Sequence, residues 1–382
     1  MKRVGLALLA LVLVMGMVPV RAKALELNVA GKGAVLMDIA TGTVLYEKDS
    51  HERLAPASVT KVMTMLLIME AIDSNRIRWE DTVTASEAAA AKGGSQIYLK
   101  VGETMTVRDL VKSIAVSSAN DAACAMAEHI AGSESAFVSM MNQRAKELGM
   151  LDTNFVNCTG LDDAEEAKEH LTSAYDIAIM SRQLLKNHPD ILKFTTIWMD
   201  SVRNGEFGLS NTNKMVRFYS GCTGLKTGYT SGAGFCLSAS AEREGLGLIA
   251  VVLGCETSQD RFSACKSMLD YGFANYALVT PEAPKNTEVP VTLGAADSVT
   301  AVPGEQTALL IDKSQRDQVS VSVELEPAVA APVSKGQRLG TMTVRSGEQV
   351  LAQIPMVARE AVPRLTYGEL FLEVLRRIAM AQ

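Results

Sequence analysis

A serine and a lysine three residues apart, Ser58 and Lys61, are the strongest candidates for chemistry in this 382-residue sequence. They stand at the head of an apolar run, Val62 to Ile72, and if this run is a helix, both side chains lie on one face, one turn apart. A serine hydroxyl becomes a nucleophile when a neighbouring base takes its proton, and a lysine amine shielded from water can be that base. The pair therefore predicts covalent catalysis, with Ser58 as the nucleophile.

Two further motifs support the interpretation of this pair as catalytic. Ser-x-x-Lys alone is expected about once or twice by chance in a chain of this size, and it recurs at Ser263 to Lys266. Downstream of Ser58, however, come Ser118-Ala119-Asn120 and then Lys226-Thr227-Gly228. Taken singly, the first fits a loop between helices and the second fits an ordinary strand with an exposed lysine. Their combination and order favour one site, and Ser263 is disqualified because it follows both motifs.

The elements that must position these motifs follow from periodicity and turn residues. The stretch from Gly33 to Lys48 predicts two strands around a turn at 40–42, and further strands are expected near Leu225, at 234–241 and at 247–254. Helices are predicted between them, including one capped by Thr106, one capped by Asp121, and two at 134–148 and 173–187. Strands at both ends with helices between them indicate an α+β domain, with an antiparallel sheet covered by helices.

The remainder of the chain divides into two parts. Prolines at 281, 284 and 290 predict a linker, and the Val/Thr-rich alternation that follows predicts a small β-sandwich domain at 281–361. Residues 362–382 predict a C-terminal amphipathic helix, with Tyr367, Phe371 and Ile378 on one face. Such a helix suits a membrane surface, although packing against its own chain or another copy explains the periodicity equally well.

The leader and the charge balance bear on location and partners. Residues 1–24 have the layout of a secretory signal peptide, and the apolar segment falls short of the roughly 20 residues that a retained membrane helix needs. Cleavage would leave 33 basic and 43 acidic residues, a balance that argues against nucleic-acid binding. The four histidines lack metal-ligand spacing, so neither a metal nor another cofactor is expected. The six cysteines could pair in an exported protein, but their apolar surroundings favour mainly buried free thiols.

The ordered motifs resemble the penicillin-recognising active-site serine family. Four segments are similar to its low-molecular-weight D-alanyl-D-alanine carboxypeptidases in particular: Pro56 to Lys61, Gly94 to Leu99, Asn157 to Asp162 and Gly224 to Gly234. The resemblance spans nearly the whole chain. It implies a DD-peptidase catalytic domain at 25–280, outside the cytoplasm, with peptidoglycan stem peptides as substrates and β-lactams as inhibitors.

The resemblance also implies a role for each residue. Ser58 would attack the carbonyl between the last two D-alanines while Lys61 takes its proton, and the N–H groups of Ser58 and Tyr229 would form an oxyanion hole. Ser118 would relay a proton to the leaving D-alanine, and Asn120 would donate to the substrate's amide oxygen. Lys226 and Thr227 would hold the terminal carboxylate, and Gly228 would let the substrate backbone approach the strand.

One feature departs from the family pattern. Some members place an arginine shortly before the Lys-Thr-Gly strand to bind the carboxylate, but the matching position here is Thr212. Lys214 and Arg217 are the nearby cations that could replace it. The carboxylate contacts are therefore the least defined part of the predicted site.

Several alternatives use the same motifs. A transpeptidase or a DD-endopeptidase differs in acceptor or donor, which the sequence separates poorly. A class A β-lactamase needs a Glu-x-x-Leu-Asn segment to direct its deacylating water, and this chain has no such segment after Asn120. A non-catalytic peptidoglycan-binding or sensor protein would not require a nucleophile beside a base. The sequence thus favours a carboxypeptidase that penicillin acylates and from which the penicilloyl group is released slowly.

Overall fold

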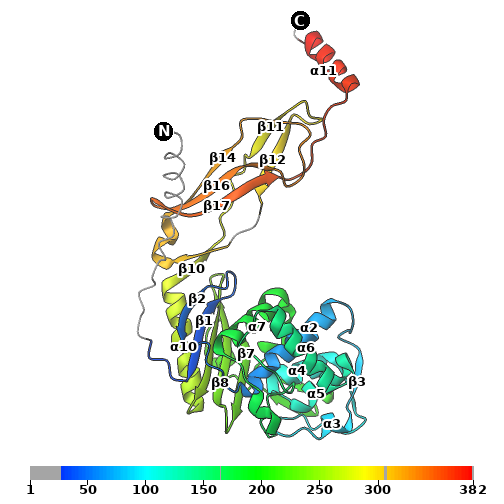
Figure 1. Cartoon of the computed structure of the whole chain (residues 1–382), viewed down its shortest axis with the longest axis vertical. Coiled ribbons are helices and arrows are strands. Elements are labelled where there is room, and N and C mark those ends of the chain that lie inside the picture. Colours follow the sequence, from blue (N-terminus) through cyan, green and yellow to red (C-terminus); the bar gives the residue numbers. More distant parts are fainter. Residues whose placement is uncertain (1–26, 164, 305–307, 381–382) are drawn as a thin grey trace, which may run out of the picture.

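The computed structural model describes residues 27–163, 165–304 and 308–380, so the predicted signal peptide lies outside the described residues. The molecule is elongated (Figure 1). A body of helices and sheet forms one end, a β-rich region follows, and a single helix, α11 (Tyr367–Met380), stands at the far end. The α+β architecture with a β-rich second region is the predicted one.

The body is built on a five-stranded antiparallel sheet with the order β2-β1-β9-β8-β7. The pairing of β1 with β9 makes strands from the two ends of this region neighbours in the sheet. The predicted Lys-Thr-Gly strand begins earlier than expected, so residues 226–228 lie in its middle and not at its start. The strands are β1 (Gly33–Asp38), β2 (Val44–Lys48), β7 (Cys222–Thr230), β8 (Gly234–Arg243) and β9 (Leu246–Cys255).

Both faces of this sheet are buried, as the alternation along β1 shows. Val35 and Met37 belong to the core beneath α2 (Lys61–Asp73) and α7 (Ala174–Asn187), whereas Ala34 and Leu36 belong to the core beneath α10 (Ser258–Asn275). Successive side chains of a strand point to opposite faces, so one short segment serves two cores. The sheet is therefore the middle layer of three (Figure 1).

Helix α2 runs through the centre of the helical layer. Ten of its thirteen residues are buried, which agrees with an apolar run that has no polar face. The other helical elements are α3 (Glu87–Ala90), α4 (Val107–Ser117), α5 (Asn120–Ala131), α6 (Glu134–Glu147), α8 (Leu192–Thr195), α9 (Met215–Phe218) and the 3-10 turns η1 (Ala57–Thr60), η2 (Glu165–Glu169), η3 (Pro189–Ile191) and η4 (Arg203–Gly205). Two short two-stranded antiparallel sheets, β3 (Thr82–Thr84) with β4 (Thr104–Thr106) and β5 (Met199–Val202) with β6 (Phe207–Ser210), border this layer.

The β-rich region contains a six-stranded sheet with the order β14-β16-β17-β12-β11-β15. Its pairs are antiparallel except β11 with β15, and they surround a core that includes Val289, Leu339 and Met356. The strands are β11 (Glu288–Thr292), β12 (Ser298–Pro303), β14 (Val319–Leu325), β15 (Val329–Ala330), β16 (Arg338–Ser346) and β17 (Gln349–Ala358).

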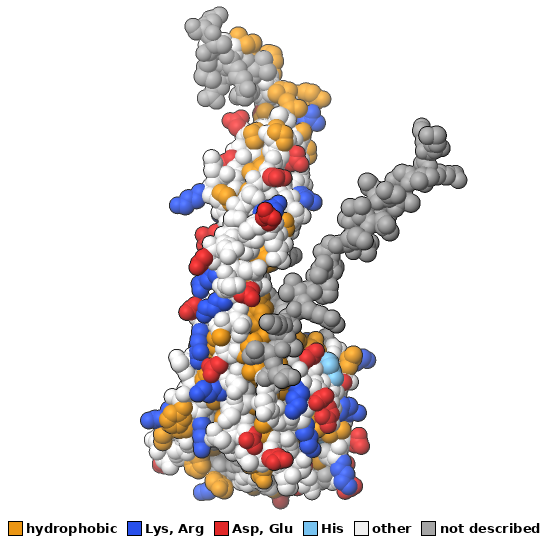
Figure 2. Space-filling model, turned by 90° about the vertical axis from the view of Figure 1, so that its left-hand side faces the viewer, with side chains coloured by type: hydrophobic (Ala, Val, Ile, Leu, Met, Phe, Trp, Pro, Cys, Tyr) orange, Lys and Arg blue, Asp and Glu red, His pale blue; other side chains and the backbone are white. Residues whose placement is uncertain are grey.

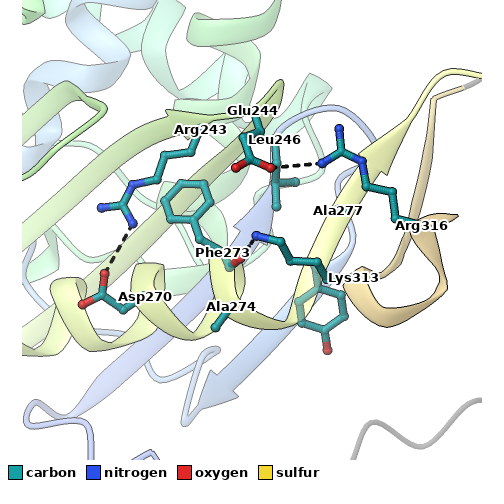
Figure 3. Close-up of a pocket in the computed structure, with 10 residues that line it drawn as sticks. Arg243, Glu244, Leu246, Asp270, Phe273, Ala274, Ala277, Lys313 and Arg316 are labelled. Carbon is teal, nitrogen blue, oxygen red and sulfur yellow. Dashed lines mark hydrogen bonds and ion pairs between the residues drawn. The ribbon is translucent and has the colours of Figure 1, made fainter.

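The two regions are connected by a junction with its own strand pair, hydrogen bond and ion pair (Figure 3). Strand β10 (Tyr276–Val279) leaves α10 and pairs with β13 (Leu309–Asp312), which leads into the 3-10 turn η5 (Lys313–Gln318). From η5, Lys313 donates to the carbonyl of Phe273 on α10 across 3.0 Å, and Arg316 lies 3.0 Å from Glu244. These contacts line a hollow of about 320 Å³.

The cysteines and the tail complete the description. All six cysteines are free thiols and five of them are buried, as expected. On α11 the side chains of Tyr367, Phe371 and Leu372 are exposed, and Figure 2 shows hydrophobic side chains at this end of the molecule. None of the described helices is long and apolar enough to cross a membrane.

Candidate active site

The predicted nucleophile and base meet at the junction of η1 and α2. The Nζ atom of Lys61 lies 2.9 Å from the Oγ atom of Ser58, and it also donates to the carbonyl oxygen of Thr159 across 2.8 Å. The Lys61 side chain is completely buried. Burial disfavours the ammonium form and lowers the pKa of Lys61 to about 7, against smaller opposing effects of Cys158 and Asp121. A neutral amine beside a serine hydroxyl is the arrangement that general-base activation needs.

The turn that carries Ser58 is held by unusually close packing. Ala57 has a positive φ of 48°, and a Cβ on Gly160 would lie 1.9 Å from the Ala57 carbonyl oxygen, so only glycine fits at residue 160. Thr60 donates to that same carbonyl across 2.8 Å and contacts the Nε2 atom of His170 at 2.8 Å. The backbone around the nucleophile is therefore fixed from two sides.

His170 is a supporting residue that the sequence did not reveal. Burial first, and then the charge of Lys61, lowers the pKa of His170 to about 4, so the ring is neutral at physiological pH. Its Nδ1 atom accepts from the backbone N–H of Val156, which leaves the proton on Nε2 for Thr60. Nothing in the spacing of the four histidines indicated this role.

The second motif lies where α4 ends and α5 begins. Ser118 is buried and has a left-handed conformation with φ 65° at the C-terminus of α4, and Asn120 opens α5. The Nδ2 atom of Asn120 donates to the carbonyl of Gly93 across 2.7 Å, while its Oδ1 atom is buried without a partner. Ser118 makes no hydrogen bond to Ser58 or Lys61, all three of which are described residues.

Asp121 does not cap α5, contrary to the prediction. The N-cap is Ala119, and the buried carboxylate of Asp121 instead accepts from the backbone N–H groups of Ile97 and Leu99 at 3.0–3.2 Å. Asn120 reinforces this contact, since its own backbone N–H donates to the carbonyl of Ser95. The segment that contains residues 94–99 is thereby attached to the start of α5.

The third motif lies on the edge strand β7, directly against η1. A Cβ on Gly228 would lie 2.6 Å from the Pro56 carbonyl oxygen and 3.1 Å from the backbone nitrogen of Ser58, so the two chains touch there. Tyr229 follows, with its ring 56% exposed and stacked on Phe235 at 4.3 Å between centroids. The backbone of β7 and the nucleophile are thus immediate neighbours.

Lys226 and Thr227 occupy the same edge. Lys226 is buried and donates to the carbonyl of Thr227 across 2.8 Å. Its pKa lies well below the ordinary value because of burial first, and then because of the positive charges of Lys61 and Arg261. Thr227 donates to the hydroxyl of Thr212 across 2.6 Å, so Thr212 lies directly beside this strand.

The two cations proposed as substitutes for the arginine are directed elsewhere. The guanidinium of Arg217 lies over the rings of Trp198 and Phe218, at 5.8 and 5.7 Å from their centroids. Lys214 lines a separate hollow with Phe262 and Ser263. Within the described residues, no three His, Cys, Asp or Glu side chains are grouped to hold a metal ion.

Comparison with known proteins is consistent with this geometry. A family model described as D-alanyl-D-alanine carboxypeptidase matches residues 20–257, and one described as the C-terminal domain of penicillin-binding protein 5 matches residues 278–364. The chain belongs to the D-alanyl-D-alanine carboxypeptidase family. The family assignment made from the motifs is therefore confirmed.

Relatives and solved structures of this family cover most of the chain. It is 44% identical to the D-alanyl-D-alanine carboxypeptidase DacF of Bacillus subtilis, over 88% of this chain and 86% of the relative. Penicillin-binding protein 5 from Haemophilus influenzae superposes with a TM-score of 0.74 at 30% identity, over 88% of this chain and 98% of the other. Penicillin-binding protein D2 from Listeria monocytogenes, solved in a cefotaxime-bound form, matches at 31% identity with a TM-score of 0.60, over 65% and 100%.

Proposed function

We propose that the protein is a serine-type D-alanyl-D-alanine carboxypeptidase that removes the terminal D-alanine from peptidoglycan stem pentapeptides through an acyl-enzyme on Ser58. The observation that carries the proposal is the 2.9 Å contact between Lys61 Nζ and Ser58 Oγ, made by a fully buried lysine in a chain of this family. A neutral Lys61 accepts the hydroxyl proton as Ser58 attacks the D-alanyl carbonyl carbon. The scissile C–N bond then breaks, and the leaving D-alanine amine takes up a proton.

The oxyanion of the tetrahedral intermediate is assigned to the backbone N–H groups of Ser58 and Tyr229. The close approach of Gly228 to the Ser58 nitrogen supports this assignment, because it places the two peptide groups side by side. Ser58 lies in the first turn of η1, which leads directly into α2, so the N-terminal end of these helical turns adds positive potential where negative charge develops. Donors held in place before the reaction stabilise the transition state without reorganisation.

The remaining roles follow from position and chemistry. Ser118, buried beside Asn120, relays the proton to the leaving amine. The Nδ2 group of Asn120 has two hydrogens, and only one of them is donated to the Gly93 carbonyl. The second can be donated to the substrate's amide oxygen, and the unpaired Oδ1 suits a substrate N–H. Lys226 and Thr227 hold the terminal carboxylate, which separates this substrate from a mid-chain peptide bond. Water then hydrolyses the ester.

The same acylation chemistry makes β-lactams inhibitors of this protein. A β-lactam ring presents an amide carbonyl beside a carboxylate, and the cefotaxime-bound relative shows that a member of this fold accommodates one. Transpeptidation and endopeptidase activity use the same residues and are distinguished by the product released. Slow deacylation of penicillin separates the proposal from a β-lactamase.

We further propose that residues 25–280 are the catalytic domain, 281–361 a supporting β-domain, and 362–382 an anchor on the outer face of the cytoplasmic membrane, after export directed by residues 1–24. The exposed apolar side chains of α11 support this, since α11 stands at the opposite end of the molecule from the body that contains α2 (Figure 1) and hydrophobic side chains show at that end (Figure 2). The active site would then face the wall, held away from the membrane by the β-domain.

The test is incubation of the purified protein with a stem pentapeptide, followed by an assay for free D-alanine. We expect stoichiometric release of D-alanine from the peptide, and slower cleavage of its C-terminally amidated form, which releases D-alaninamide. Cross-linked peptide without net hydrolysis would assign a transpeptidase instead. Absence of turnover and of penicillin labelling would favour a binding protein.

A further inference from the structure

Arg261 of α10 is a buried cation whose interactions with this site were not expected from the sequence. Its side chain is 8% exposed, and its Nη1 atom donates to the carbonyl of Gly228 across 2.8 Å and to that of Cys236 across 3.3 Å. No carboxylate of the described residues lies within 4.0 Å of the guanidinium, and its Nε atom has no partner. A buried charge without an ionic partner is costly, so its other interactions must offset that cost.

The surroundings keep the guanidinium in one position. It lies over the rings of Phe235 and Phe262, at 5.2 and 5.0 Å from their centroids, and Nη2 donates to Ser258 across 3.3 Å. The aromatic faces stabilise the cation without a counter-ion. The Nη1 edge of the guanidinium is therefore directed at two backbone carbonyl oxygens.

The carbonyl of Gly228 is covalently joined to the N–H of Tyr229, since both belong to one peptide group. The C=O and N–H bonds of a trans peptide point in opposite directions. Strand β7 is an edge strand whose sheet neighbour is β8, and Gly228 pairs in register with Cys236 of β8. Because Arg261 binds the Gly228 carbonyl together with that of Cys236, this carbonyl faces β8, and the N–H of Tyr229 faces the free edge where η1 and Ser58 lie.

We propose that Arg261 is a positioning residue of the oxyanion hole: its bond to the Gly228 carbonyl aims and polarises the Tyr229 N–H that receives the developing negative charge. This rests on the proposed function, because it presupposes an acyl transfer at Ser58. Hydrogen bonds in series strengthen one another, so a cation on the carbonyl side makes the amide a better donor on the other side. The effect increases with charge on the substrate oxygen, so it acts on the transition state more than on the bound substrate.

Two substitutions at Arg261 separate polarisation from packing. Arg261→Gln removes the charge, and Arg261→Lys keeps a charge and an aliphatic stem against Phe235 and Phe262. We expect Arg261→Gln to lower kcat and kcat/KM equally, by about tenfold. This loss is smaller than the roughly 10²- to 10³-fold decrease in kcat that follows removal of a whole oxyanion donor, because the Tyr229 N–H is weakened and not removed. Arg261→Lys should recover part of that loss. KM should stay unchanged in both.

The decisive readout is the stretching frequency of the ester carbonyl in the penicillin acyl-enzyme, measured by infrared difference spectroscopy with ¹³C-labelled inhibitor. A weaker Tyr229 donor shifts this band to higher wavenumber in Arg261→Gln, with Arg261→Lys between it and the wild type. Arg243→Gln is the matched control, because Arg243 also lies over two aromatic rings but next to the domain junction (Figure 3), and its band should not move.

Each outcome has one meaning. If the wild type forms no acyl-enzyme, the proposed function fails. If it does, and both Arg261 variants give the wild-type band and acylation rate, the role assigned to Arg261 is wrong. If Arg261→Gln does not fold, the test rests on Arg261→Lys alone. A wild-type ester carbonyl band in Arg261→Lys would then show that Arg261 is a purely structural residue, and a shifted band would support the proposal.

Discussion

The Nζ atom of Lys61 contacts the Oγ atom of Ser58 at 2.9 Å from inside the protein, with no part of the lysine side chain exposed. Burial thus supplies what the spacing alone cannot, an amine with its pKa lowered to about 7 beside the hydroxyl that we propose it deprotonates. The second Ser-x-x-Lys pair differs in this respect. Ser263 and Lys266 lie on α10 and line an open hollow with Lys214.

Ser58→Ala is therefore expected to abolish covalent labelling by a fluorescent penicillin, whereas Ser263→Ala should label like the wild type. The reason is chemical, because alanine has no oxygen to form the ester and Ser263 has no buried amine beside it. Intact-protein mass spectrometry would count the attached groups. Labelling of the Ser58→Ala protein at another residue would overturn the assignment of the nucleophile.

The pH dependence follows from the two buried lysines. Lys61 accepts a proton only in its neutral form, so kcat/KM should fall about tenfold per pH unit below about 7 and level off above it. Lys226 binds a carboxylate only when charged, and its lowered pKa places a falling limb well below pH 10.5. A bell-shaped profile is expected for the peptide acid.

An ester or amide that lacks the terminal carboxylate provides the control for this profile. Such a substrate should react more slowly but keep the rising limb and lose the falling one. A rising limb that is absent from both substrates would contradict Lys61 as the base.

The contact between β7 and η1 is testable through Gly228. Gly228→Ala places a methyl group 2.6 Å from the Pro56 carbonyl oxygen, so the two backbone segments must separate. Because these segments carry the two proposed oxyanion donors, acylation should slow by about 10- to 100-fold. Gly208→Ala on β6 is the control, since nothing lies within 4 Å of a Cβ there. Equal acylation rates for both variants, measured with a chromogenic cephalosporin, would refute the close-contact argument.

The parts of the site that the sequence predicted are those that depend on local pattern. One-turn spacing brought Ser58 to Lys61, and the sequence pattern predicted the one strand that carries Lys226 and Gly228. The parts that were missed depend on contacts between distant residues. Asp121 has the residue type and position of a helix cap, yet its carboxylate binds backbone N–H groups 22 and 24 residues earlier. No local pattern distinguishes these two uses of an aspartate.

Other residues were missed because they act through backbone groups. Lys61 donates to the carbonyl of Thr159, and Arg261 donates to the carbonyl of Gly228. Every residue has a backbone carbonyl, so the sequence does not show which one a side chain will bind. The pairing of β10 with β13 is a similar case, since four residues before the proline-rich stretch join a strand about thirty residues later. Such pairings are set by the tertiary fold.

The carboxylate site can be probed by restoring the charge that this chain lacks. Thr212 touches Thr227, so Thr212→Arg should add a charge-assisted bond to the substrate's terminal carboxylate and lower KM by about tenfold. Steady-state kinetics with the pentapeptide acid and its C-terminal amide should show the gain for the acid alone. Arg217→Ala is expected to leave both KM values unchanged, because Arg217 stacks on Trp198. An equal effect on acid and amide would show that Thr212 does not lie at the carboxylate.

The proposed membrane attachment rests on the exposed apolar side chains of α11. Deletion of residues 363–382 should move the protein from the sedimenting fraction to the supernatant when it is spun with phospholipid vesicles, while hydrolysis of a soluble pentapeptide stays the same. Replacing Phe371 and Leu372 by serine should weaken binding in the same direction, because each loses most of the apolar area that it can bury. Leu151→Ser is the matched control, since Leu151 is 90% exposed but lies in the catalytic region. If the double serine variant and the Leu151 variant sediment alike, the helix is not an anchor and packing against another copy becomes the better account of its apolar face.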